Sequence, residues 1–478
     1  MKLKLFYLIL LLFVGGCSLH KPQATPYADM PATYSAMTEA EGGLPLADHE
    51  RWWQAFDDPQ LNAVIAKGLA GNLEMEAAWA RLRQAEALEG KENASFWPSL
   101  DLAGSGGLSR FSGSTTDAAR YQGSLAAAYE LDVWHKLAQR RRATSLQRQA
   151  ADHELKAFYL SLAAQLAEAY YDVVELRERI DLNREMVASF AKTAELVAWR
   201  YRRGVAPSLD LYQARQSLLN SQAELPLLEA QLQAAENRLA VLLGVRPGRQ
   251  EIGSLIELPD LQLSFAQGLP ADLITNRPDI QAAYAGLQAA DAQVAAAIAE
   301  RFPSFKLTAD YGGQSSELHS LLQSPNLFWN LLANMALPII DGGRRAYEVE
   351  HKQALFAERA ALYRRTVLEA LQEVEDALVR EYSVDANLDM LEERQQVTAA
   401  THRLALERYQ QGLADFLPVL TAQNSDVTVR LALIAAQRQR ISSRIQLARA
   451  LGGSWVHDEV AAADQRRRTA AKIIVADP

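Results

Sequence analysis

The stretch RYRRGV at residues 200–205 recurs as RYQQGL at residues 408–413, 208 positions further along the chain. The same spacing relates a further set, namely Leu196, Leu209, Ala214 and Leu243-Gly244 to Leu404, Leu417, Ala422 and Leu451-Gly452. Upstream, Pro98-Ser99 recurs as Pro303-Ser304 at a spacing of 205. This period is too long for a solenoid, whose units have about 20–50 residues. The sequence therefore predicts two duplicated, pseudo-symmetric halves.

Long helices are predicted on both sides of each repeated turn. Neither residues 124–203 nor residues 344–411 contain a Gly or a Pro. We expect antiparallel helices over 134–200 and 205–244 in the first half, and over 343–408 and 413–452 in the second.

Apolar residues at seven-residue spacing indicate that these helices form coiled coils. One stripe is Leu155, Leu162, Ala169, Leu176, Asn183, Phe190 and Val197, and the other is Tyr159, Leu166, Val173, Ile180, Val187, Ala194 and Tyr201. Asn183 is the one polar amide in these stripes, and a lone polar seam residue commonly fixes register. Glu381, Gln395 and His402 make the second half less regular.

Two β-hairpins are predicted at about 98–133 and 303–340, where apolar and polar residues alternate. Strands of about ten residues with this alternation suit a transmembrane β-barrel. From the pattern alone, a hairpin packed on a soluble domain is an equal alternative. Four strands cannot close a barrel, and an open edge in lipid leaves N–H and C=O groups unpaired at several kcal/mol each. If the hairpins are in a membrane, several copies must share one barrel, and three copies would supply twelve strands.

The N-terminus predicts a lipoprotein signal over residues 1–16. Lys2 and Lys4 precede ten apolar residues, which are too few to span a bilayer, and Gly15-Gly16-Cys17 resembles a bacterial lipobox. We expect acylation of Cys17 and a linker over 17–58; an ordinary signal peptide with a chance Cys is the alternative. The net charge of −9 argues against nucleic acid as a partner, and one Cys excludes a disulfide within one chain.

Seven motifs resemble the TolC-like outer-membrane efflux proteins, in particular the lipoprotein branch that serves resistance-nodulation-division (RND) pumps. They are WWQAFDDPQL (52–61), YELDVW (129–134), RYRRGV (200–205), LPADL (269–273), RPDI (277–280), LPIIDGGR (337–344) and RYQQGL (408–413). Two positions depart from the family pattern: His135 stands where Gly is usual, and Asn276 stands where Arg is usual.

The resemblance implies a mainly α protein with membrane β-strands. Three copies would form a twelve-stranded barrel and a twelve-helix tunnel. The two efflux repeats would cover 59–244 and 271–452, with a belt segment at 245–270 and a further belt segment and flexible tail at 453–478. The protein would be a passive, non-enzymatic conduit without a cofactor beyond the lipid on Cys17. It would lie in the Gram-negative outer membrane, extend into the periplasm and pass drugs, toxic compounds or metal ions.

The same resemblance implies two kinds of site at the helical tips. The tips would dock a periplasmic membrane-fusion adaptor, which would connect them to an inner-membrane RND transporter, through Arg200, Tyr201, Gly204, Val205, Leu209, Arg408, Tyr409, Gly412, Leu413 and Leu417. The alternative for Tyr201 and Tyr409 is that they only close the coiled-coil seam.

Asp415 and Asp210 are the candidate pore-gate residues; the alternative is that they are solvated turn residues. Ala414, Pro418 and Thr421 occupy positions where some relatives carry linking or gating residues. Three copies of an Asp around one axis would repel one another and favour cations. We expect Asp415→Ala to raise the conductance.

Three other classes of protein remain as alternatives. An enzyme lacks support because the sequence has no His-Glu-x-x-His, no phosphate-binding Gly-rich loop and no nucleophile elbow. A coiled-coil envelope lipoprotein would explain Cys17 and the heptads, but not the hairpins or the duplication. The exit duct of a type I secretion system is the nearest alternative within transport.

Overall fold

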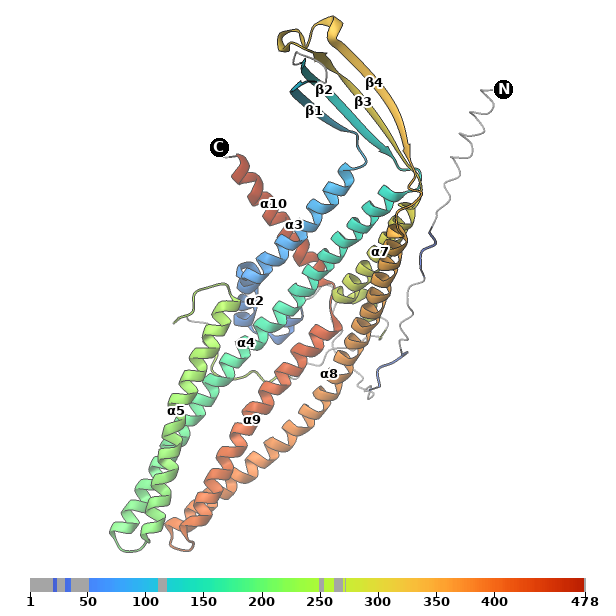
Figure 1. The fold of residues 1–478 in the computed structure, drawn as a ribbon. Coiled ribbons are helices and arrows are strands. Elements are labelled where there is room, and N and C mark those ends of the chain that lie inside the picture. Colours follow the sequence, from blue (N-terminus) through green and yellow to red (C-terminus); the bar gives the residue numbers. More distant parts are fainter. Residues whose placement is uncertain are drawn as a thin grey trace. The chain divides into compact units, whose positions relative to one another are not determined.

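The computed structural model describes residues 20–23, 31–35, 51–110, 118–248, 253–261, 270 and 272–476 (Figure 1). The predicted signal segment, Cys17 and most of the predicted linker lie outside the described residues, as does part of the expected belt segment at 245–270. The chain divides into two compact units. One contains the strands with residues 80–153 and 280–366, and the other contains most of the helical residues.

The elements follow the predicted order within both halves. The first half has η1 (Trp52–Phe56), α2 (Pro59–Gly71), α3 (Leu73–Ala94), β1 (Ser99–Ser109), β2 (Ala118–Leu131), α4 (Lys136–Arg202) and α5 (Ser208–Leu242). The second has α6 (Asp272–Asn276), α7 (Pro278–Ala299), β3 (Ser304–Ser315), η2 (Leu318–Ser320), η3 (Ser324–Asn326), β4 (Leu327–Ala336), α8 (Arg344–Gln410), α9 (Phe416–Leu451) and α10 (Trp455–Ala476). The prediction of a helix-rich fold with antiparallel strands is confirmed.

The strand unit is built on one antiparallel sheet with the order β1-β2-β3-β4. Ser99 pairs with Ala128, Ala128 with Thr308, and Thr308 with Leu332, so one row crosses all four strands. Within the described residues, β1 and β4 each pair on one side only and form the two edges of the sheet.

The corners between strands and long helices are fixed by acidic caps. The Asp132 carboxylate accepts hydrogen bonds from the backbone N–H groups of Leu137 and Ala138, both at 2.8 Å, and so satisfies donors that the start of α4 leaves free. His135, directly before α4, adopts a φ of 59°. Its counterpart 208 residues on is Gly343, directly before α8, with a φ of 85°. The residue at which the sequence departs from the family pattern therefore has a left-handed backbone that Gly adopts with less strain.

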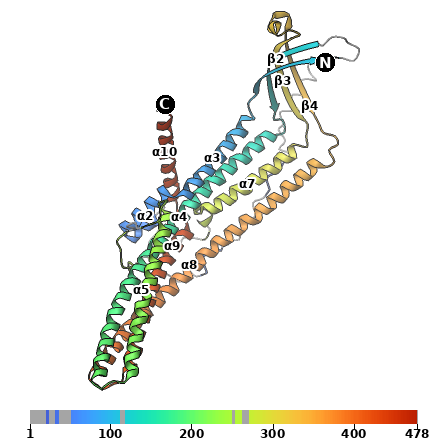
Figure 2. The same cartoon turned by 60° about the vertical axis from the view of Figure 1, so that its left-hand side comes forward.

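The helical unit contains two antiparallel hairpins, the lower parts of α4 with α5 and of α8 with α9, which lie side by side in two views (Figures 1 and 2). The heptad stripes of α4 are largely buried, with Leu155, Leu166 and Val173 almost fully so. Asn183 is buried too, and its amide donates to the backbone oxygen of Ser221 on α5 at 3.3 Å. This hydrogen bond favours one register between α4 and α5.

An aromatic cluster within the helical unit joins η1 to α10 and to α4. Trp53 of η1 meets Trp455 of α10 edge to face at 4.7 Å between ring centroids, and Phe56 lies against Tyr171 of α4 at 6.1 Å. Asp58 then caps α2 by accepting from the N–H groups of Gln60 and Leu61. The Trp-Trp motif thus joins the start of the first repeat to the C-terminal helix, and its role in this structure is packing.

The C-terminal stretch 453–478, expected as a belt segment and a flexible tail from Arg466 onward, forms the helix α10 up to Ala476. The physical reason is visible in its contacts. Arg467 lies over the ring of Trp79 at 5.1 Å, and Arg468 pairs with Asp464 one turn earlier at 2.7 Å. The stretch also lacks Gly and Pro before Pro478, so helix propensity agrees with these contacts. Among the described residues, no helix is long and apolar enough to cross a membrane.

Candidate functional site

The sheet has one apolar and one polar face, which the register assigns residue by residue. Cross-strand partners share a face. The apolar face carries Leu100, Leu102, Leu125, Tyr129, Phe305, Leu307, Tyr311, Trp329, Leu331 and Met335. The opposite face carries Asp101, Gln122, Glu130, Lys306, Asp310, Gln314, Asn330 and Asn334.

Much of the apolar face is left exposed by the part of the chain that the structure describes. Leu102 and Trp329 are among the most exposed large apolar side chains of the described residues. A contiguous exposed apolar surface marks contact with a partner or a membrane. Polar residues on the other face suit water, so the two faces of the sheet suit different surroundings.

The two helical hairpins end in turns of the same construction. In the first, Gly204 has a φ of 74° and its N–H donates to the Tyr201 oxygen, while the Val205 N–H donates to the Arg200 oxygen. In the second, Gly412 has a φ of 75°, and Gly412 and Leu413 donate to the oxygens of Tyr409 and Arg408. Both are Schellman turns, in which a left-handed residue allows the last helical carbonyls to be bonded. This explains why Gly recurs at the two positions.

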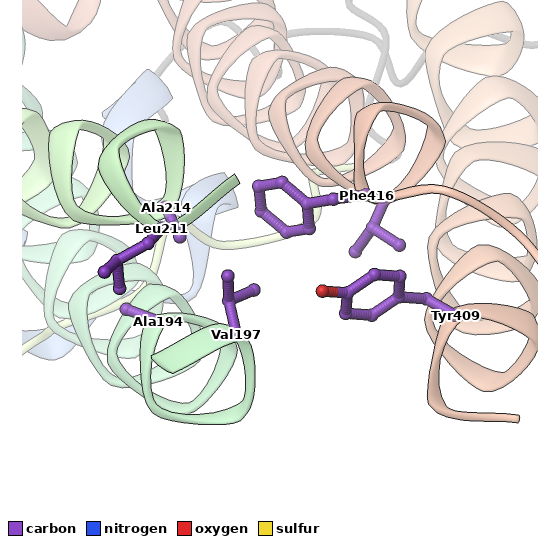
Figure 3. Close-up of a cluster of buried hydrophobic side chains, with 7 residues drawn as sticks. Ala194, Val197, Leu211, Ala214, Tyr409 and Phe416 are labelled. Atoms are coloured by element: carbon purple, nitrogen blue, oxygen red, sulfur yellow. The ribbon is translucent and has the colours of Figure 1, made fainter. Parts of the chain in front are cut away.

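Seven buried side chains join the two tips into one cluster, which we call the tip core: Ala194, Val197, Leu211, Ala214, Tyr409, Phe416 and Val419 (Figure 3). The first hairpin supplies small and aliphatic residues, and the second supplies the aromatic pair Tyr409 and Phe416, whose ring centroids are 5.6 Å apart. The tip core therefore holds the two hairpins of one chain together.

Arg200 makes a second connection between the hairpins. Its guanidinium donates to the backbone oxygens of Tyr409 and Gln410, and its Cζ lies 4.4 Å from the centre of the Tyr409 ring. Those two oxygens belong to the C-terminal end of α8, where helical carbonyls lack intrahelical donors and the helix dipole is negative. A cation is favoured at that place, so Arg200 of the first tip completes the end of the second.

The two predicted gate residues lie within electrostatic reach of each other. Burial raises the pKa of Asp210 above its ordinary value, the charge of Asp415 raises it further, and Arg200 opposes the shift. The pKa of Tyr409 is also raised, mainly by burial, with Arg200 opposing and Asp210 adding to the shift. Asp415 precedes α9 but its side chain makes no capping hydrogen bond. The structure thus places Asp210 within electrostatic reach of Asp415, of Arg200 and of Tyr409, which belongs to the tip core.

The predicted docking residues divide into exposed and enclosed ones. Val205, Leu209, Leu413 and Leu417 are exposed apolar side chains at the tips, and Tyr201 and Arg408 are exposed as well. Tyr409 is only 2% exposed, so its side chain is not available at the surface. Sequence reasoning missed Phe416. A comparison of the repeats could have found it, because its counterpart 208 residues earlier is the polar residue Ser208.

Metal binding was not predicted, and among the described residues no group of three or more His, Cys, Asp or Glu side chains is placed to hold an ion. Cys17, the predicted lipidation residue, lies outside the described residues.

A sheet with one apolar and one polar face, combined with two long helical hairpins, defines the structural class of the protein. The chain belongs to the outer membrane efflux protein family, whose model matches residues 64–245 and 269–453. The two matched stretches of the chain thus fall on the two repeats.

Individual relatives agree with the family. The chain is 29% identical to the probable efflux pump outer membrane protein SepC of Pseudomonas putida, over 95% of this chain and 98% of that one. It is 29% identical to the outer membrane protein OprJ of Pseudomonas aeruginosa, over 94% and 95% of the two chains. The solved outer-membrane channel OprN matches with a TM-score of 0.86 and 27% identity, over 92% of this chain and 100% of that chain.

These findings support an outer-membrane efflux component over a secretion exit duct or a coiled-coil tether. The family is one of transport components, so the enzyme alternative gains no support from it.

Proposed function

We propose that three copies of the chain form a passive conduit for small molecules through the outer membrane. The four-stranded sheets would join into one twelve-stranded barrel, and the long helices would form a twelve-helix tunnel. The observation that carries this proposal is the two-faced sheet with two unpaired edges. A barrel places its apolar face toward lipid and its polar face toward a water-filled lumen.

The backbone groups at the two edges of the sheet support a barrel that several copies share. In lipid, each unpaired N–H or C=O group costs several kcal/mol, because no water is present to bond it. The edges β1 and β4 have eleven and ten residues. Pairing β4 of one copy with β1 of the next removes both edges, and a ring of identical head-to-tail contacts closes with cyclic symmetry.

The tips would dock a periplasmic membrane-fusion adaptor, itself bound to an inner-membrane RND transporter. The exposed apolar residues Val205, Leu209, Leu413 and Leu417 support this role, since they stand in pairs at equivalent positions of the two tips. Tyr201 would contribute directly to docking. Tyr409 and Arg200 would act by holding the tips in shape, because their contacts are within the chain.

The pore would narrow at the tips, with Asp210 and Asp415 as the gate. Their mutual repulsion and the opposing charge of Arg200 support a gate that responds to protonation. Asp415→Ala removes both bulk and charge, so we expect a higher conductance in planar bilayers. Asp415→Asn keeps the bulk and is the matched control: it should lower the preference for cations without the same rise in conductance. If Asp415→Ala leaves the conductance unchanged, Asp415 is not part of the gate.

Acylation of Cys17 would anchor each copy to the membrane, as the lipobox-like sequence indicates. Three residues later, His20 bonds Asp291 of α7 at 2.7 Å, so the segment that follows the anchor is attached to the strand unit. Cys17→Ser should abolish labelling by a radioactive fatty acid; persistent labelling would contradict the lipobox interpretation.

Two neighbouring residues of β4 test the membrane role of the sheet. Leu331 is on the apolar face and Leu332 on the polar face, and both are exposed. An Arg facing lipid near the bilayer centre costs about 2–4 kcal/mol, whereas lumen positions tolerate charge. We expect Leu331→Arg to reduce membrane insertion and channel activity in planar bilayers, while Leu332→Arg inserts normally. Equal insertion of both variants would contradict the proposed orientation of the sheet.

A further inference from the structure

Three large apolar side chains are exposed at one end of the sheet, where β1 begins and β4 ends; we call this end the base. Trp97 precedes β1 and is 77% exposed, and Ile339 and Ile340 follow β4 and are 89% and 91% exposed. All three belong to the strand unit. They flank the two edges of the sheet, and the shared barrel of the proposed function would bring these edges together between copies.

The register shows how the base is staggered across the sheet. The row that starts at Ser99, the first residue of β1, crosses β4 at Leu332. β4 continues four residues beyond that row, to Ala336. β2 and β3 also extend past the row, to Leu131 and Ser304. Relative to that row, β2 extends three residues further at the base, and β3 and β4 each extend four.

This stagger matches the tilt of a closed barrel. Four residues at ~3.3 Å each, over three strand spacings of ~4.8 Å, correspond to a tilt of about 43°. Strands of transmembrane barrels are tilted by about 35–45°. The average offset per strand is one to two residues. Applied to the contact between two copies, this average places Ser99 of the next copy about five residues beyond Leu332. Trp97 of that copy, two residues further toward the base, would then lie beside residue 339.

We propose that Trp97 of each copy packs against Ile339 and Ile340 of its neighbour, and that this base cluster fixes the register between copies. The proposal rests on the shared barrel and names the contact that sets its stagger. A second copy fits better than lipid as the partner, because the exposed groups continue from the two edges that would pair and the average offset between strands places them at one level. A buried Trp also supplies large contact area at a specific position.

Disulfide scanning in the full-length protein in membranes tests the register directly. Cys17 is the only native cysteine, so each added pair is easily assigned. Trp97→Cys is combined in turn with Leu332→Cys, Met335→Cys, Leu337→Cys, Ile339→Cys or Asp341→Cys, and oxidised. We expect cross-linked dimers and trimers on non-reducing gels, several-fold more with Ile339→Cys than with Leu332→Cys. The single variants control for reaction with Cys17.

Failure of the base cluster can be told from failure of the shared barrel. A cross-linking maximum at Leu332→Cys or Met335→Cys, or no cross-link in a protein whose detergent mass is that of a trimer, overturns the cluster and leaves the barrel intact. A monomeric mass overturns both.

A second measurement does not require Trp97 to be replaced. Ile339→Asn should lower the temperature at which the trimer dissociates in SDS. Leu322→Asn is the control, because Leu322 is equally apolar and 78% exposed but lies in the loop between β3 and β4, at the other end of the sheet. If lipid covers the base, Ile339→Asn will lower the dissociation temperature no more than Leu322→Asn does.

Discussion

The two helical tips carry the same motif in different surroundings. Tyr201 and Tyr409 occupy equivalent positions after the same Arg, and both helices end in a Schellman turn at Gly. Yet Tyr201 is 43% exposed, whereas Tyr409 is 2% exposed. Arg200 reaches across to the other tip, while its counterpart Arg408 is exposed. Duplication has preserved the local turn, and the packing partners decide what each side chain does.

One substitution between the repeats accounts for much of this difference. Phe416 packs on Tyr409 in the tip core, and its repeat counterpart is the exposed residue Ser208. Without an aromatic residue at position 208, Tyr201 lacks the equivalent ring neighbour and stays at the surface. The second tip is thus enclosed by the first, and the exposed side chains of the first remain free to meet a partner.

The largest effect is expected from Phe416→Ala. Removing a fully buried aromatic ring costs about 3–5 kcal/mol. Amides around Tyr409 should therefore exchange with solvent much faster, as measured by hydrogen exchange. Ser208→Ala is the matched control at the other tip and should change exchange little. Similar effects at both positions would refute the asymmetry.

The next effect is expected from Arg200→Gln. It removes charge-assisted hydrogen bonds, each of which contributes about 1.5–3 kcal/mol, and the contact with the Tyr409 ring. The two tips should separate more easily, which in planar bilayers should appear as more frequent opening. Arg408→Gln, at the equivalent position, should leave opening unchanged. An Arg408→Gln channel that opens as often as Arg200→Gln would show that the motif acts the same way in both repeats.

A smaller effect is expected at the corners before the long helices. A left-handed conformation costs a non-Gly residue about 1–2 kcal/mol, and His135 has this conformation where the second repeat has Gly343. His135→Gly should therefore raise the melting temperature slightly. Gly343→Ala should lower it, because its φ of 85° disfavours a side chain. A lower melting temperature for His135→Gly would show that the imidazole makes a stabilising contact outweighing the strain.

The smallest effect concerns pH. The pKa of Asp210 is raised when the tips are packed, so the packed tips hold its proton more tightly than separated tips do. Packing is then favoured as the pH falls through the raised pKa, and the gain is complete below the ordinary Asp pKa of about 3.9. Channel opening should become rarer on acidification, and Asp415→Asn should weaken this dependence. Opening that increases at low pH would contradict the sign.

Periodicity and duplication predicted the helices, hairpins and turns, because these depend on local sequence. The heptad stripes identified buried residues such as Leu166 and Val173, and the Gly of each tip marked the turn. The contact of Arg200 with the α8 terminus and the burial of Tyr409 could not be predicted, since they depend on how two separate hairpins pack. The helix α10 was missed because its stability comes partly from Trp79, nearly 400 residues away in sequence.

The central claim is that one copy holds only a third of the barrel wall. Native mass spectrometry of the full-length protein extracted in mild detergent tests it most directly. We predict a mass of three chains that forms channels on reconstitution. A monomer that conducts ions by itself would contradict the shared barrel.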